Sequence, residues 1–172
     1  MRCLHDRRGL LESHAPAATV LIRVAVGVVF VSEGAQKFLY ADALGAGRFA
    51  KIGIPAPEVM GPFVGVVEIV CGLLILVGLL TRLAAVPLTI DMLVALASTK
   101  VPILLGHGYS VFAAPPVSKT GFWSMLHESR TDLSMVLGSV FLLLVGAGKW
   151  SADVVLSRRL TGAPVQLTRH RD

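Results

Sequence analysis

One long apolar run constrains the fold of this chain more than any other feature. Residues 60–80 are apolar except for Glu68, which lies near the middle of the run. About 20 consecutive apolar residues are enough to cross the hydrocarbon core of a bilayer as a helix. A carboxylate at that depth is costly unless it is protonated or paired inside the protein, so it marks a candidate functional site. The run therefore predicts a membrane-spanning helix with an acid at its centre.

Three further segments repeat this pattern of an apolar run interrupted by a few charged residues. Only 16% of the 172 residues are charged, whereas soluble domains contain about a quarter. Only Thr81 and Arg82 separate the second run from the third, so these two helices must be antiparallel neighbours. The predicted spans, each long enough to cross a bilayer, are residues 17–40, 58–80, 83–105 and 131–148.

The arginines predict the orientation of the chain in the membrane. An even number of spans places most of them on one side, namely Arg2, Arg7, Arg8, Arg82, Arg158, Arg159, Arg169 and Arg171. Cytoplasmic segments carry an excess of Lys and Arg, so we expect both termini in the cytoplasm. A cleaved signal peptide is the alternative for the N-terminus, but the first run contains Arg23 and lacks an Ala-x-Ala exit.

These observations predict an all-α fold, an integral membrane four-helix bundle with cytoplasmic N- and C-termini. Its parts are a cytoplasmic N-terminal segment, 1–16, a transmembrane domain, 17–150, and a basic cytoplasmic tail, 151–172. The net charge of +5 does not indicate nucleic-acid binding, because the basic residues are concentrated at the chain ends as topology signals. The sequence has no nucleotide-binding motif, and its cysteines and histidines lack the spacing of a metal site.

Helix geometry then predicts which charges meet inside the bundle. Arg23 lies about six residues from the cytoplasmic end of its span, and Asp91 lies about eight residues from the same end of another. At 1.5 Å per residue, the two differ in height by only a few ångströms. We therefore expect a structural ion pair between Arg23 and Asp91 in the inner half of the bundle.

A second group of ionisable residues converges in the outer half of the predicted bundle. It is expected to form a polar pocket with apolar walls that opens outward. His127 stands at the mouth and has the side chain whose charge changes most readily near neutral pH. The candidates for ligand binding or proton handling are Glu33, Lys37, Glu68, Lys100, Asp132 and His127. For Glu68 a structural role, as a Lys-paired or protonated acid that fixes helix register, remains open.

Glycines flank Glu68 along its own helix face. Gly61, Gly65, Glu68 and Gly72 recur at spacings of four, three and four residues. Small residues at this spacing let another helix approach closely inside a membrane. Either a partner helix or a ligand can therefore lie next to Glu68.

Several spaced motifs resemble the DoxX family of small membrane proteins. They are Arg23-x3-Gly27-x2-Phe30-x3-Gly34-x2-Lys37, then Gly53-Ile-Pro, then Glu68-x3-Gly72-x5-Gly78-x2-Thr81-Arg82-x-Ala84-Ala85, and finally Gly146-Ala-Gly148-Lys-Trp-Ser151-Ala-Asp153. The resemblance covers about residues 19–153 and implies a four-helix integral membrane bundle. Members are similar to subunits of membrane oxidoreductase systems, including a thiosulfate:quinone oxidoreductase and a complex for thiol and superoxide defence. Residues matching polar positions of the family are Arg23, Lys37, Glu68, Asp132 and Asp153.

The first functional hypothesis is therefore a multi-pass subunit of a quinone-linked oxidoreductase in the bacterial inner membrane. The outer-half cluster would bind a quinone head group or pass protons to it. The expected partners are the lipid bilayer, a soluble redox protein and a second copy of the chain, with no nucleic acid. Whether the chain is catalytic by itself stays open. The alternatives are a non-enzymatic membrane scaffold and a protein that binds or transports a small solute.

Overall fold

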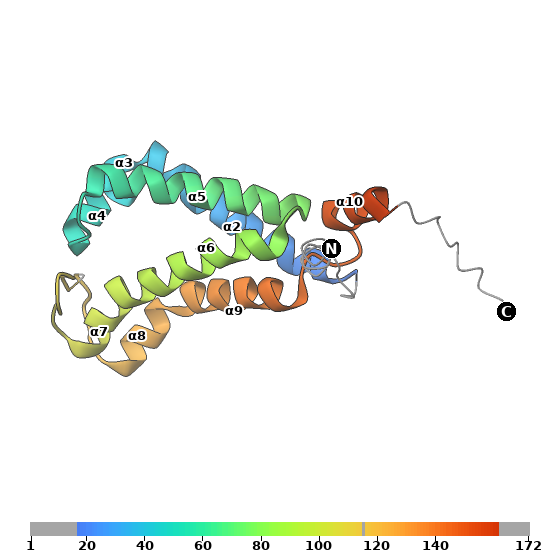
Figure 1. Ribbon diagram of the computed structural model, residues 1–172. Coiled ribbons are helices and arrows are strands. Elements are labelled where there is room, and N and C mark those ends of the chain that lie inside the picture. Colours follow the sequence, from blue (N-terminus) through green and yellow to red (C-terminus); the bar gives the residue numbers. More distant parts are fainter. Residues whose placement is uncertain (1–16, 115, 162–172) are drawn as a thin grey trace.

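The computed structural model of the protein is all-helical and describes residues 17–114 and 116–161, with side chains up to residue 156 (Figure 1). The predicted N-terminal segment and several arginines behind the orientation prediction lie outside these residues. In chain order the helices are α2 (Thr19–Leu39), α3 (Ala41–Leu44), α4 (Ala46–Ile52), α5 (Pro57–Val77), α6 (Thr81–Ala95), the π-helical η1 (Leu96–Lys100), α7 (Val101–Leu105), α8 (Phe122–Glu128), α9 (Arg130–Val145) and α10 (Ala152–Thr161).

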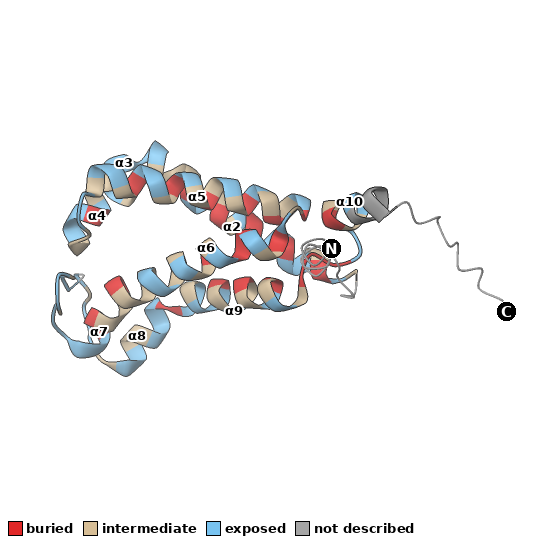
Figure 2. Ribbon diagram, viewed as in Figure 1, coloured by how far each residue is buried: buried red, intermediate tan, exposed pale blue. Residues whose placement is uncertain are grey.

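Three helical segments are long and apolar enough to cross a membrane: Thr19–Leu39, Pro57–Val77 and Thr81–Leu105. They agree with the first three predicted spans to within three residues at each end. Large apolar side chains such as Val66 and Leu93 are exposed along them (Figure 2), as expected where acyl chains rather than water surround the helices. The fourth predicted span corresponds to α9, which has 16 residues and runs alongside α6 (Figure 1).

The third segment contains a π-helical insertion just before a proline. Pro102 lacks a backbone N–H, so it cannot donate the hydrogen bond that an α-helix requires at this position. Within η1 the Thr99 hydroxyl donates to the Ala95 carbonyl at 2.6 Å, and Val101 N donates to Leu96 O. Such insertions change the direction of side chains and are frequent at functional sites.

Helices α2 and α5 pack closely because glycines face one another. A Cβ atom on Gly34 would lie 2.6 Å from the Gly65 carbonyl oxygen, and one on Gly27 would lie 2.9 Å from the Gly72 oxygen. The predicted close approach at the glycine face of α5 is thus confirmed: its partner is α2 at Gly65 and Gly72, and the start of α4 at Gly61. Buried apolar side chains, including Val26, Ile75, Leu88 and Leu142, then join this pair to α6 and α9.

A set of polar contacts fastens the end of the molecule that carries the Gly78–Leu80 turn and α10; we name it the turn end. Arg23 is 2% exposed and donates to the carbonyls of Ile75 at 2.9 Å, Leu76 at 2.6 Å and Ala147 at 3.2 Å, and also to that of Trp150. The last carbonyls of a helix lack intrahelical donors, and a guanidinium with several N–H groups satisfies them.

Asp153 completes the turn end from the opposite side of the α5–α6 turn. Its carboxylate accepts hydrogen bonds from the backbone N–H of Leu80 at 2.7 Å and of Thr81 at 3.3 Å. These are amides at the start of α6, which have no partner within the helix. Gly78 lies between the two charged side chains with φ of 74°, and a Cβ there would come within 2.5 Å of the Arg23 guanidinium. The spacing from Gly78 to Thr81 therefore reflects this packed turn.

The predicted ion pair between Arg23 and Asp91 is wrong. Arg23 is level with Ile75, to which it donates, whereas Asp91 interacts with Glu68, seven residues earlier on α5. Seven residues of α-helix correspond to about 10 Å, so the two side chains lie at different heights. Counting from the expected span ends put the two residues only a few ångströms apart in height, and so misplaced Asp91 by more than one helical turn.

Candidate functional site

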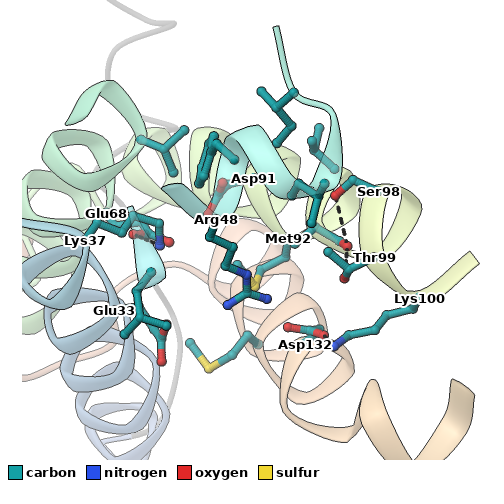
Figure 3. Close-up of a pocket in the computed structure, with 18 of the residues that line it drawn as sticks. Glu33, Lys37, Arg48, Glu68, Asp91, Met92, Ser98, Thr99, Lys100 and Asp132 are labelled. Carbon is teal, nitrogen blue, oxygen red and sulfur yellow. Dashed lines mark hydrogen bonds and ion pairs between the residues drawn. The ribbon is translucent and has the colours of Figure 1, made fainter. Parts of the chain in front are cut away.

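A cavity of about 450 Å³ lies between the α2–α5 pair and the segment formed by α6, η1 and α9. Helix α4 covers it at the end of the molecule opposite the turn end (Figures 1 and 3). Apolar side chains such as Phe30, Met92 and Met135 form much of its wall. The ionisable residues that line it are Glu33, Lys37, Arg48, Glu68, Asp91, Lys100, Glu128 and Asp132. The arrangement is an apolar chamber with a few charged groups.

A buried ion pair lies at the deep side of the cavity. Lys37 Nζ is 2.6 Å from Glu68 Oε2, and Glu68 is 1% exposed. Glu68 lies on the glycine face of α5, so α2 comes close enough for the Lys37 side chain to reach it. Opposite charges attract far more strongly in a low-dielectric interior than in water. The pair therefore keeps two charges stable inside an apolar structure.

Asp91 adds a second carboxyl group beside this pair. The Asp91 and Glu68 side chains interact with each other, and the positive charge of Lys37 also attracts the Asp91 carboxylate. Asp91 Oδ2 is buried and has no hydrogen-bond partner. A buried polar atom without a partner is costly, so this oxygen is available to a water or a ligand group. We call Lys37, Glu68 and Asp91 the carboxyl–lysine trio.

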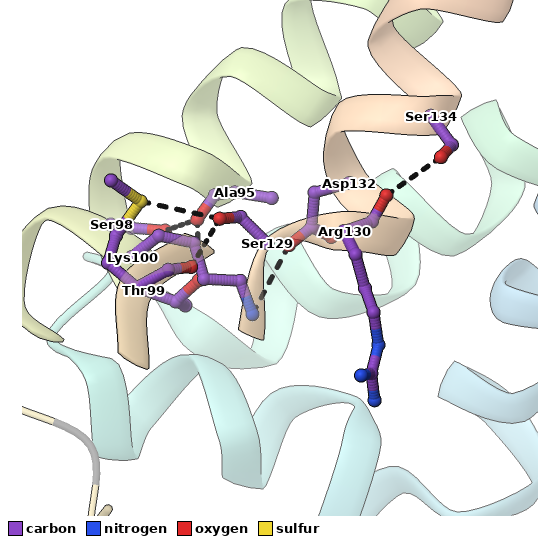
Figure 4. A network of polar contacts seen from close by, with 9 residues as sticks. Ala95, Ser98, Thr99, Lys100, Ser129, Arg130, Asp132 and Ser134 are labelled. Atoms are coloured by element: carbon purple, nitrogen blue, oxygen red, sulfur yellow. Dashed lines mark hydrogen bonds and ion pairs between the residues drawn. The ribbon is translucent and has the colours of Figure 1, made fainter. Parts of the chain in front are cut away.

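A second ion pair stands at the wall formed by η1 and α9. Lys100 Nζ lies 3.2 Å from Asp132 Oδ2, and the two side chains are 14% and 21% exposed. The π-helical geometry of η1 presents Lys100 toward the first turn of α9, while Ser98 and Thr99 bond back to the Ala95 carbonyl (Figure 4). The Ser129 hydroxyl donates to the Met125 carbonyl and fixes the junction of α8 and α9.

The structure brings five of the six predicted site residues to one cavity: Glu33, Lys37, Glu68, Lys100 and Asp132. Glu33 is exposed at the cavity rim, and Lys37 pairs with Glu68 rather than with Glu33. His127 does not join them. Its side chain is exposed, lies outside the cavity lining, and its ring is 3.1 Å from Arg130 Nη1.

Three ionisable lining residues were not predicted as part of this site: Arg48, Asp91 and Glu128. Asp91 was assigned to Arg23, although Asp91, Ala95 and Ser98 recur at helical spacing and so share one face. Arg48 lies outside the four predicted spans, in the segment between the first and the second. The spacing of Leu44, Arg48 and Ile52 is also helical, and that signal predicts a short helix with Arg48 on its inner face.

Comparison with known proteins identifies the family. Residues 18–101 match DoxX. The chain is 53% identical over 152 residues to the uncharacterized membrane protein Rv3486 of Mycobacterium tuberculosis, covering 88% of this chain and 89% of that protein. The chain belongs to the DoxX family. An uncharacterized protein of Haemophilus influenzae is 30% identical to this DoxX protein over 145 residues, covering 83% and 93% of the two chains. No solved structure matches it.

Family membership and the three candidate spans make this DoxX protein a multi-pass membrane protein. The segment matched to the family includes all three members of the carboxyl–lysine trio, as well as Arg23 and Lys100. It ends before α8 and α9, which supply Asp132. The deep side of the cavity is thus built by the matched segment, and part of its rim is built by the remaining chain.

We expect Lys37→Met to destabilise the protein by about 3 kcal/mol, because it leaves Glu68 buried without its cation. The double variant Lys37→Met/Glu68→Met should recover most of that loss, since it removes both charges. Lys100→Met is the comparison variant and should cost less, because the Asp132 side chain is 21% exposed whereas that of Glu68 is 2% exposed. Thermal unfolding in detergent measures all three. A Lys37→Met variant as stable as Lys100→Met would contradict the buried-pair interpretation.

Proposed function

We propose that this DoxX protein is a membrane subunit of an oxidoreductase system and binds a quinone head group in its cavity. The observation that carries the proposal is the carboxyl–lysine trio at the deep side of an apolar cavity of about 450 Å³. Ligand sites of this kind usually enclose about 300 to 1,000 Å³ and combine apolar walls with a few convergent polar groups.

The lining residues suit a planar ring that carries carbonyl oxygens on opposite edges. Phe30, Met92 and Met135 offer apolar contact to the faces of such a ring. Lys37 Nζ has three N–H groups, and its bond to Glu68 uses only one of them. The unpartnered Asp91 Oδ2 supplies a second polar contact when a ligand oxygen carries a proton.

A quinone supplies an acceptor for two electrons and two protons. The task of the chain is to hold the head group and to handle the protons. Lys37 is placed to donate a hydrogen bond to a carbonyl oxygen, while Glu68 and Asp91 are placed to pass a proton. Between the trio and the turn end, the buried side chains of Ile75 and Leu88 separate the cavity from that end of the molecule. The electrons would come from a redox centre in a partner protein.

We also propose that α9 is the fourth span of a four-helix bundle in the bacterial inner membrane and that the turn end faces the cytoplasm. In support, α2 begins and α9 ends at the turn end (Figure 1), and Arg82 lies there too. A membrane-impermeant maleimide should label Lys119→Cys but not Trp150→Cys in intact cells, with Cys3 and Cys71 replaced by serine. The reverse labelling pattern would contradict this orientation.

The quinone proposal predicts that purified protein is stabilised against heat by a soluble quinone analogue. Lys37→Met should weaken analogue affinity by roughly tenfold to a hundredfold, because it removes a charge-assisted hydrogen bond. Lys51→Met removes a cation from the exposed part of α4, outside the cavity lining, and should leave affinity unchanged. Titration calorimetry in detergent measures the affinities.

Three further results would decide between the proposal and its rivals. A wild-type protein that neither copurifies with quinone nor responds to the analogue would overturn it. If Glu68→Gln lowers stability while growth under thiol stress follows protein level alone, the chain is a scaffold. Solute flux through liposomes carrying only this protein would indicate transport.

A further inference from the structure

The exposed rim of the cavity has two chemically different sides. On the side of α2, α8 and α9, the residues that both line the cavity and are exposed are polar: Glu33, Glu128 and Thr131. On the side of α5 and α6 they are apolar: Pro55, just before α5, and Val94, on α6, which is 47% exposed. The remaining exposed lining residue, Arg48, belongs to α4, the helix that covers the cavity. An amphipathic ligand can satisfy this asymmetry in only one orientation.

The apolar side lies directly beside the carboxyl–lysine trio. Val64 precedes Glu68 by four residues on α5, and Val94 follows Asp91 by three residues on α6. Both valines line the cavity, and the two helices are antiparallel. Each valine therefore stands about one helical turn from the trio toward α4. Together they form a level apolar boundary, which we name the α5–α6 seam.

The α5–α6 seam faces the hydrocarbon part of the membrane. Val94 precedes the end of α7 by 11 residues, or about 16 Å of helix, which is close to half of a core about 30 Å thick. Large exposed apolar side chains flank it, including Phe63 and Val66 on α5 and Ile90 and Leu93 on α6. The surroundings of the seam are thus acyl chains rather than water or head groups.

Resting on the proposed quinone site, we propose that the ligand is a long-tailed lipid quinone whose isoprenoid tail leaves the cavity through the α5–α6 seam. The head group then lies at the trio, and the tail passes between Val64 and Val94 into the bilayer. The opposite side is unsuited to a tail, because an apolar chain there would replace the polar surroundings of Glu33 and of the Lys100–Asp132 pair (Figure 3). That side remains open for proton exchange.

The experiment compares a tail-less benzoquinone with a quinone that carries a long isoprenoid tail, each titrated into purified protein in nanodiscs. Wild-type protein should bind the tailed quinone more tightly. Val94→Trp narrows the seam and should weaken binding of the tailed quinone by about tenfold while changing that of the tail-less quinone by less than about twofold. Val70→Trp is the matched control: Val70 is 49% exposed on α5, lies outside the cavity lining, and should change neither affinity.

Thr131→Trp places the same bulk on the polar side of the rim. It therefore distinguishes a tail that leaves through the α5–α6 seam from one that leaves on the polar side. The proposal is overturned if Thr131→Trp rather than Val94→Trp selectively weakens the tailed quinone, or if Val94→Trp weakens both quinones equally or neither. If the wild type binds no quinone of either kind, the proposed function itself fails. Binding of both quinones without selective loss in Val94→Trp overturns only the tail route.

Discussion

A charge that this chain buries in the membrane needs a partner inside the protein. Lys37 and Glu68 show how the sequence meets that constraint: glycines on α2 and α5 bring the two helices together, and the ion pair forms across them. Because the charges are enclosed, the cavity beside them can hold a polar group at membrane depth. The close helix contact and the polar site are therefore one feature, and disturbing either affects the other.

The molecule separates its polar groups into two layers. At the turn end, Arg23 and Asp153 bind backbone groups of the α5–α6 turn and leave little to offer a ligand. In the cavity, Asp91 keeps a buried oxygen without a partner, and the exposed rim differs from side to side. Buried apolar residues lie between the layers. We interpret the first layer as structural and the second as the functional one.

The sequence predicted the long helices well, because apolar runs of this length have few other stable solutions. It also predicted that Lys37, Glu68, Lys100 and Asp132 would converge, because the rise per residue of a helix converts a sequence position into a depth in the membrane. Rise alone says nothing of direction around the helix axis or of the true helix ends, so Arg23 was paired with Asp91 instead of with backbone carbonyls. Arg48 was missed as a lining residue because α4 lies between two predicted spans, where no site residue was expected. The η1 insertion depends on local packing before Pro102, which periodicity does not indicate.

A structure of the protein purified in its native lipid would show directly what the cavity holds in the cell. We expect density for a planar head group within hydrogen-bond distance of Lys37 or Asp91, with a tail that leaves between α5 and α6. A cavity that holds only water, or a quinone bound elsewhere on the surface, would contradict it.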